Sequence, residues 1–377
     1  MAIYLDNMAS TPVDPRVAER HRDAMIKYPG NAHSAEHAFG EEAERAIAEA
    51  EKTLLHALDS EAEAVTFTPG ASAALWLAVE DAIARTVVGK PARVAATSVE
   101  HPALLSALRR AEGEGRLRVI IVSVDDTAAP RTDALEEALT HGVDLLCTMA
   151  ANNEVGTISD LAAISALAAR HGARHLIDAS QAAGRIDMSA AASADLVVVS
   201  GAKAYGPRRA GALVGKLSSR AASLAHDVFG SPDAPAAVAL AFAMEVRATE
   251  RQADERRLAG MRDALQARLM ADVPDLRING AVGSRLAGSL HVSTPHLPGE
   301  AVVAQLWGRI AVSTGAACQS GVPGPSHVLA AMGLPDWVKE GAVRIGLGRF
   351  NTEAEIEEAG DLLTAALGAV NPARKYA

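Results

Sequence analysis

Short apolar runs alternate, over the first two thirds of the chain, with longer segments in which apolar residues recur at helical spacing. Several of the runs are apolar almost throughout, which is typical of strands that are covered on both faces. The predicted strands are 63–68, 92–97, 118–123, 143–150, 174–179, 195–200 and 211–215. The predicted helices are 34–58, 71–87, 101–112, 132–140 and 158–171. This alternation predicts an α/β fold with a mainly parallel seven-stranded sheet.

The last third of the chain has a different pattern. A nearly proline-free segment, 235–272, is expected to form one or two helices, and it is followed by the strand-like runs "LRING", "GSLHVST" and "RIAVST" and a final helix over "TEAEIEEAGDLLTAALGAV". We interpret this part as a smaller α+β domain, 251–377, which follows a large domain over 16–250. Segment 1–15 is expected to pack with the small domain.

Composition narrows the class of protein. The 36 basic and 46 acidic side chains leave a formal net charge of −10, which argues against a nucleic-acid or anionic-membrane surface. No apolar run approaches the roughly 18 residues of a membrane span, and the N-terminus has no signal-peptide pattern. The two cysteines, Cys147 and Cys318, are too few for a disulfide framework. We therefore expect a cytoplasmic protein.

A lysine stands at the mouth of one of the most apolar predicted strands. The stretch "DLVVVSGAKAYGPRRAG" runs from the strand 195–200 into Lys203. An ammonium group in this position is costly unless the amine is paired, deprotonated or covalently engaged.

Three other features also follow predicted strands, where open α/β sheets bind their ligands. Backbone N–H groups of Gly70, Ala71 and Ser72, with the Ser72 hydroxyl, could seat an anion at a helix N-terminus, although a plain turn looks the same. Asp178 could hold a cationic ring nitrogen or cap a helix, and His101 could be structural. Together with Lys203 these residues suit pyridoxal 5'-phosphate (PLP), with the lysine as the Schiff-base partner, Asp178 at the pyridine nitrogen and the phosphate on the helix terminus.

With these residues in view, the chain resembles the cysteine desulfurases of the NifS/IscS type, in the class-V aminotransferase superfamily, over nearly its whole length. The matching stretches occur in one order along the chain: "YLDNMASTPVDPRV", "GNAHSAEHAFGEEA", "FTPGASAA", "EHPAL", "MAANNEVGTI", "IDASQAAGRI", "SGAKAYGPRRAGAL", "STGAACQSG", "PSHVLAAMGL" and "VRIGLGRFNTEAEI". The resemblance implies PLP-dependent fold type I, with the cofactor bound by the large domain and a cysteine-bearing loop in the small one.

The resemblance also implies roles for individual residues. Lys203 would bind PLP covalently, Asp178 would pair with its ring nitrogen, and His101 would stack on the ring and transfer protons. Gln181 would contact the phenolic oxygen, and Ser200, with Gly70, Ala71 and Ser72, would hold the phosphate. Asn153 and Arg344 would bind the substrate carboxylate, because a guanidinium fork suits that group.

Cys318 matches the nucleophile of the family, and Cys147 is expected to be an inert core residue. The implied reaction converts L-cysteine to L-alanine and leaves the sulfur on Cys318 as a persulfide for an acceptor protein, which could serve iron–sulfur cluster or thio-cofactor synthesis. A homodimer is implied, because the active sites of the family are completed across a subunit boundary.

The sequence departs from the family at the phosphate. Ala202 stands where the family has a histidine that contacts this group, and Arg208 or Arg209 could compensate. Gly230–Ser231 replaces the Gly-Thr that the second subunit supplies, so Ser231 is the candidate for that contact. Two alternatives stay open: a related PLP-dependent lyase or aminotransferase on the same scaffold, such as a selenocysteine lyase, and a low-activity scaffold paralogue, which these departures suggest.

Overall fold

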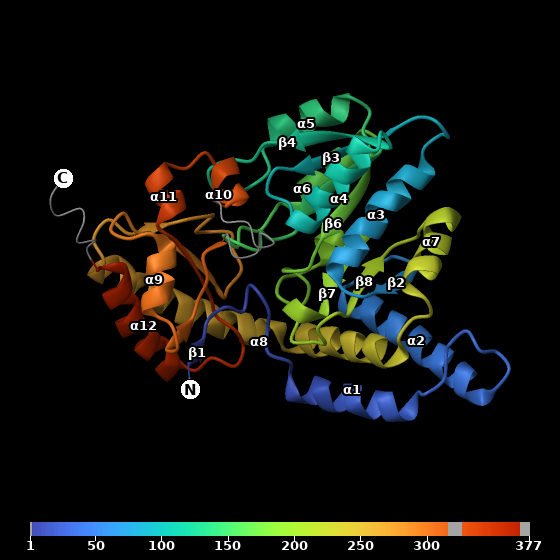
Figure 1. Ribbon diagram of the computed structural model, residues 1–377, viewed down its shortest axis with the longest axis horizontal. Helices are drawn as coiled ribbons and strands as arrows, with labels where there is room; N and C mark the ends of the chain where they lie inside the picture. Colours follow the sequence, from blue (N-terminus) through green and yellow to red (C-terminus); the bar gives the residue numbers. More distant parts are fainter. Residues whose placement is uncertain (1, 316–325, 370–377) are drawn as a thin grey trace.

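The computed structural model describes residues 2–315 and 326–369. Within these ranges a seven-stranded sheet dominates the fold (Figure 1), with the strand order β2-β8-β7-β6-β5-β3-β4. Its strands are β2 (Val65–Thr68), β3 (Ala92–Thr97), β4 (Leu117–Val122), β5 (Leu145–Met149), β6 (Arg174–Asp178), β7 (Leu196–Ser200) and β8 (Gly211–Val214). Strand β8 is antiparallel to both of its neighbours, and the pairs from β7 to β4 are parallel. The predicted fold class and the seven predicted strands are confirmed.

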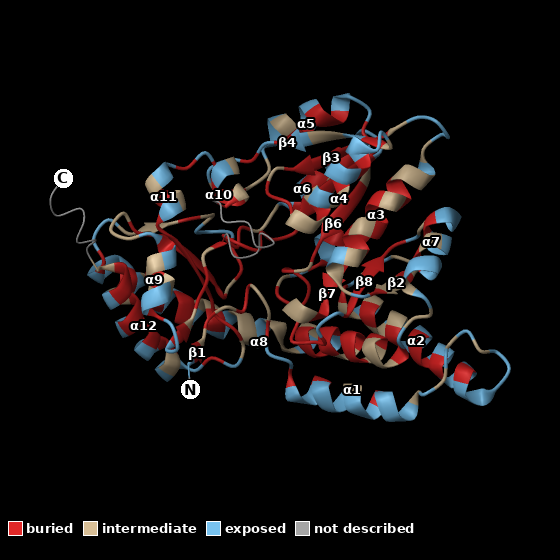
Figure 2. Cartoon of the chain, in the orientation of Figure 1, coloured by how far each residue is buried: buried red, intermediate tan, exposed pale blue. Residues whose placement is uncertain are grey.

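Helices cover both faces of this sheet, which explains why its central strands are apolar. Figure 2 shows the central strands as buried, and every residue of β5 and of β7 is buried. One face packs on α3 (Ala71–Arg85), α4 (Pro102–Gly113) and α7 (Ser219–Phe229). The other face packs on α2 (Ala38–Ala57), α5 (Thr132–Thr140), α6 (Leu161–Arg170) and the first part of α8 (Ala234–Asp272).

The segment predicted as one or two helices forms one helix, α8, of 39 residues. Its first half contributes Leu240 and Met244 to the core beneath the large sheet, and its second half contributes Leu258 and Leu265 to a separate core. The predicted boundary near residue 250 lies between these two sets. The change of core along α8 therefore supports two domains that share a helix.

The second core belongs to a smaller unit that contains the three-stranded antiparallel sheet β12-β10-β9. Its elements are β9 (Arg277–Ile278), β10 (Ser289–Ser293), α9 (Gly299–Gln305), β11 (Ile310–Ala311), α10 (His327–Ala331), α11 (Asp336–Glu340), β12 (Ala342–Gly346) and α12 (Glu353–Leu367). The N-terminal strand β1 (Ile3–Tyr4) pairs in parallel with β11, and Ile3 and Leu5 enter this core. These contacts support the expected packing of the N-terminal segment on the small domain.

Some elements have no counterpart among the predicted ones. Helix α1 (Pro15–Lys27) exposes most of its side chains and buries only Val17 and Ala24, so its apolar pattern is weak. Strand β12 is fully buried although it contains Arg344. None of the helices in the described ranges is long and apolar enough to cross a membrane.

Candidate active site

A cavity of about 270 Å³ opens at the carboxyl ends of the parallel strands. Nine residues singled out in the sequence line it: Gly70, Ala71, Ser72, His101, Asn153, Asp178, Gln181, Ser200 and Lys203. They come from five separate segments of the large domain. The cavity therefore assembles a single site from features that were ambiguous when taken one by one.

Lys203 ends the short 3₁₀ turn Gly201–Lys203, which begins directly after β7. Its amine donates hydrogen bonds to the backbone carbonyl oxygens of Met8, at 3.3 Å, and of Ala9. An added Cβ at Gly201 would lie 2.5 Å from the Pro207 carbonyl oxygen, so the turn requires glycine there. The ammonium desolvation cost expected at this strand end is thus offset by carbonyl groups of the N-terminal segment.

Asp178 is the last residue of β6, and it is 3 % exposed. Its Oδ1 accepts a hydrogen bond of 2.9 Å from the Ser180 backbone N–H. The charges of His101 and Asp178 interact across the cavity, since the carboxylate raises the pKa of the ring. A buried carboxylate that faces a cavity is suited to bind a cationic nitrogen.

His101 is the N-cap residue of α4, and its Nδ1 accepts a hydrogen bond of 3.2 Å from the Ala103 backbone N–H. Burial lowers the pKa of the ring, and the nearby Lys203 lowers it further against the opposing effect of Asp178. The ring is therefore neutral at neutral pH, and the capping bond assigns its proton to Nε2. To take up a proton at Nδ1, the ring would have to release the cap.

The turn from β2 into α3 forms one end of the cavity. Gly70 caps α3 with φ +106°, a conformation that favours glycine, and no side chain caps the helix. The Ala71 and Ser72 N–H groups, in the first turn of α3, have no intrahelical acceptor, which makes this end suitable for an anion. Ser200 and Arg209 line the same cavity, and so does Ala202.

Two buried carboxamides in the cavity wall leave oxygens without a hydrogen-bond partner in the described part of the chain. These are Gln181 Oε1 and Asn153 Oδ1. The Gln181 Nε2 donates to the Met8 carbonyl oxygen at 2.8 Å. Unpaired buried polar atoms are costly, and they are expected where a polar ligand completes the site.

Sequence reasoning did not single out Glu100, which precedes His101 and is fully buried. Its Oε1 accepts hydrogen bonds from Thr97 Oγ1, at 2.5 Å, and from the Met149 N–H, at 3.0 Å. Burial raises the pKa of this carboxyl well above its usual range, and the charge of Asp178 adds to the effect. The signal that could have revealed it is an acidic residue next to His101 in the short turn that follows the apolar strand β3.

Arg344 lies outside the cavity lining, behind Asn153. Its guanidinium donates to the Asn153 carbonyl oxygen at 3.1 Å and to Asp6 Oδ1 at 3.0 Å. The structure thus brings the two predicted carboxylate-binding residues into contact with each other, and only Asn153 faces the cavity.

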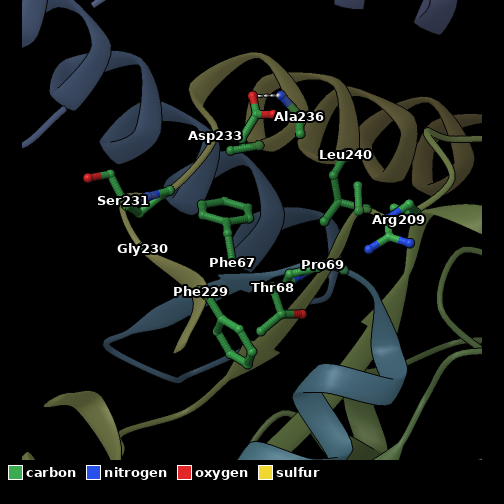
Figure 3. A pocket seen from close by; sticks show the side chains of 14 residues that line it. Phe67, Thr68, Pro69, Arg209, Phe229, Gly230, Ser231, Asp233, Ala236 and Leu240 are labelled. Carbon is green, nitrogen blue, oxygen red and sulfur yellow. Dashed lines mark hydrogen bonds between the residues drawn. The ribbon is translucent and has the colours of Figure 1, made fainter. Parts of the chain in front are cut away.

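Ser231 lines a second pocket, which shares Pro69, Arg209 and Ala210 with the first (Figure 3). Ser231 and Arg209 lie on opposite sides of this pocket, and the Ser231 hydroxyl is 3.1 Å from His33 Nδ1. The chain does not bring Ser231 into its own candidate site. The expectation that Ser231 serves a partner subunit stays a prediction.

Cys318 lies outside the described residues. Cys147 is buried in β5 as a free thiol, and burial raises its pKa well above the usual range. A thiol in this environment is a poor nucleophile, as expected for a core residue. No group of three or more His, Cys, Asp or Glu side chains suited to a metal ion occurs in 2–315 or 326–369.

The residues present fit PLP: a buried carboxylate, a lysine amine and an imidazole surround a cavity that has an anion seat at one end. Residues 3–358 match the family model "Aminotransferase class-V". The chain therefore belongs to the class-V aminotransferase family, whose cysteine desulfurase members use PLP.

Curated relatives narrow the family further. The chain is 33% identical over 367 residues to a cysteine desulfurase of Trichormus azollae, with 94% of this chain and 90% of the relative covered. It is also 33% identical to the cysteine desulfurase IscS of Anaeromyxobacter dehalogenans, with 95% and 90% covered. The solved structure of a NifS-like protein superposes with a TM-score of 0.84 at 27% identity, covering 97% of this chain and 99% of that one. These findings place the chain among the NifS/IscS-like cysteine desulfurases.

Proposed function

We propose that this protein is a PLP-dependent cysteine desulfurase that converts L-cysteine to L-alanine and transfers the sulfur to an acceptor. The observation that carries the proposal is the convergence of Lys203, Asp178 and His101 on one cavity whose far end is the N-terminus of α3. The membership of the chain in the cysteine desulfurase family supports the choice of reaction.

Each of the cavity residues would contact a different part of the cofactor. Lys203 would bind it covalently, Asp178 would keep its ring nitrogen protonated, and Gln181 would contact its phenolic oxygen. Ser200, Arg209 and the first turn of α3 would hold the phosphate. When bound, PLP supplies an electron sink for the bonds of the substrate α-carbon.

The substrate is expected to bind through its carboxylate to Arg344 and Asn153, because a guanidinium pairs with a carboxylate in two parallel hydrogen bonds. Lys203 Nζ, on the cavity wall, would move the α-proton. The neutral His101 ring would donate a hydrogen bond from Nε2 and keep the ring-binding part of the cavity dry. For His101 to accept a proton at Nδ1, its hydrogen bond from the Ala103 backbone N–H would have to break.

Cys318 is the proposed sulfur carrier. Its thiolate would attack the sulfur atom of the bound cysteine, so that a sulfur–sulfur bond forms while the carbon–sulfur bond breaks. The carbon takes the bonding electron pair and then a proton, which yields L-alanine, and Cys318 keeps a persulfide. The persulfide would pass to an acceptor protein in iron–sulfur cluster or thio-cofactor synthesis.

The assembly and location of the protein are also proposals. The Gly230–Ser231 turn faces away from the candidate site of its own chain, which supports a homodimer in which Ser231 reaches the phosphate of the partner subunit. The buried free thiol of Cys147 and the small number of cysteines support a reducing cytoplasmic location.

The test is incubation of the PLP-loaded protein with L-cysteine, followed by quantification of L-alanine and of enzyme-bound persulfide by mass spectrometry. We expect the two products in equal amounts in the first turnover, with the persulfide on Cys318. Cys318→Ala is expected to abolish both, whereas the matched variant Cys147→Ala should retain them. Alanine formation by Cys318→Ala at the wild-type rate would contradict the proposed sulfur transfer.

A further inference from the structure

Arg344 is buried beside a carboxylate that belongs to the protein itself. The arginine is 1 % exposed, and its guanidinium contacts Asp6 Oδ1 at 3.0 Å. The same Asp6 oxygen accepts a hydrogen bond of 3.1 Å from Ser313 Oγ. The group proposed to bind the substrate carboxylate is therefore already engaged with an internal one.

The backbone fixes Asp6 in this position. Asp6 forms a parallel bridge with Gly346, and Ser313 forms an antiparallel bridge with Arg344. The Gly346 N–H donates to the Leu5 carbonyl oxygen at 2.7 Å. Because Asp6 and Arg344 are 338 positions apart, the contact is a product of the fold, made by docking the N-terminal segment onto β12.

The two partners differ in their access to water. The Asp6 side chain is 21% exposed and that of Arg344 is 1% exposed. If the pair separates, the carboxylate can be hydrated at low cost, whereas the guanidinium needs a new partner. Asp6 is therefore the member of the pair that an incoming carboxylate can displace.

Two other titratable groups, Glu154 and His291, lie close enough to Arg344 for its charge to lower their pKa values. Burial raises the pKa of Glu154 to about 6, and burial lowers the pKa of His291 to about 3, which keeps that ring neutral. Glu154 Oε1 and His291 Nε2 are 3.7 Å apart. Within 2–315 and 326–369, the carboxylate of Asp6 accepts a hydrogen bond from the guanidinium.

We propose that Asp6 competes with the substrate carboxylate for Arg344 and thereby sets the affinity of the site for amino acids. This rests on the proposed role of Arg344. A ligand that also engages Asn153 and the cofactor site gains enough from those contacts to displace Asp6, whereas a simple anion does not. Asp6 thus acts as a specificity-determining residue that keeps the guanidinium paired until an α-amino acid binds.

The experiment is titration calorimetry of the PLP-loaded protein with L-alanine, which carries the same carboxylate and amine as the substrate but has no sulfur to transfer. Asp6→Asn keeps the shape of the side chain and a hydrogen-bond acceptor but removes the charge. We expect it to lower the Kd of L-alanine at least about threefold, because the competitor is weakened. Asp6→Glu keeps the charge, and no tightening is expected.

Asp14→Asn is the matched control. Asp14 also lies in the N-terminal segment and pairs with an arginine, but that arginine is Arg349, at 3.2 Å, and not Arg344. The Kd of L-alanine should stay at the wild-type value in this variant. The thermal midpoint of each variant, with and without L-alanine, separates a binding effect from loss of fold, and L-alanine should stabilise Asp6→Asn more than the wild type.

Arg344→Ala distinguishes failure of the inference from failure of the proposed function. If L-alanine binds Arg344→Ala as tightly as the wild type, Arg344 is not the carboxylate site, and its proposed role and the competition both fail, whereas the proposed reaction is judged separately by the formation of L-alanine and persulfide. If Arg344→Ala weakens binding while Asp6→Asn leaves it unchanged or weakens it, the competition is refuted and the proposed function stands.

Discussion

The two sides of the candidate site are built in different ways. On the large-domain side, Asp178 and Lys203 follow successive strands of a parallel sheet, and His101 and the α3 turn follow two others. On the opposite side, the N-terminal segment meets Lys203 and Arg344 through Ala9 and Asp6. The first side is dictated by the rule that parallel strands end at a common edge. The side formed by the N-terminal segment depends instead on how that segment packs against the large and the small domain.

The difference matters for the chemistry of the site. The large-domain side supplies groups that suit a cofactor, and each is fixed by the backbone element that carries it. The other side supplies the partners that compensate the cations when no ligand is bound. The same N-terminal segment thus stabilises Lys203 and Arg344, and a change there is expected to alter affinity more than the identity of the reaction.

The largest effect is expected from Asp178→Asn, which removes the negative charge but keeps the shape of the side chain. Alanine formation should fall about a hundredfold or more, because the ring nitrogen of the cofactor loses its anionic partner. Asp160→Asn is the control, since Asp160 caps α6 through its side chain and asparagine caps equally well. Initial rates of alanine release measure the effect, and an equal loss in both variants would contradict the role of Asp178.

The pH dependence of the free energy of unfolding tests the large-domain side separately, because His175 lies in the core of that domain. Burial lowers the pKa of His175 to about 4, below its value of about 6.5 in an unfolded chain. The unfolded chain therefore binds more protons between these two values, and the free energy of unfolding falls as the pH drops through this window.

The contribution of His175 across this window is on the order of 3 kcal/mol. His175→Gln should flatten the pH dependence of urea unfolding between about pH 6.5 and 4, because glutamine does not titrate. His171, which is exposed at the C-terminus of α6, provides the control substitution His171→Gln. An unchanged slope in His175→Gln would show that this ring does not stay neutral in the folded protein.

The smallest effect is expected at the anion seat. Arg209 lines the cavity beside Ala202, so Arg209→Ala should raise the Kd of PLP about threefold to tenfold, the range for a solvent-exposed charged contact. Arg208→Ala removes a neighbouring exposed arginine that does not line the cavity. Ala202→His should lower the Kd. Equal dissociation rates of PLP in all three variants and the wild type would refute compensation by Arg209.

The large sheet could be predicted from the local spacing of apolar residues. The large-domain side of the candidate site could be predicted too, because its residues come directly after the predicted strands. Strand β12 could not be recognised as easily, since a buried arginine interrupts its apolar pattern. The Asp6–Arg344 pair and the carbonyl groups around Lys203 could not be predicted either, because they join residues more than 190 positions apart. Glu100 was missed because a buried acidic residue next to His101 gives no periodic signal.

The central claim is that the Lys203 amine binds the cofactor in this cavity. The most direct measurement is borohydride reduction of the PLP-loaded protein, followed by protease digestion and peptide mass spectrometry. The account predicts that the reduced cofactor is attached to the peptide that contains Lys203 and that Lys203→Ala yields no such adduct. Attachment to another lysine, or an unmodified Lys203 in protein that retains PLP, would contradict it.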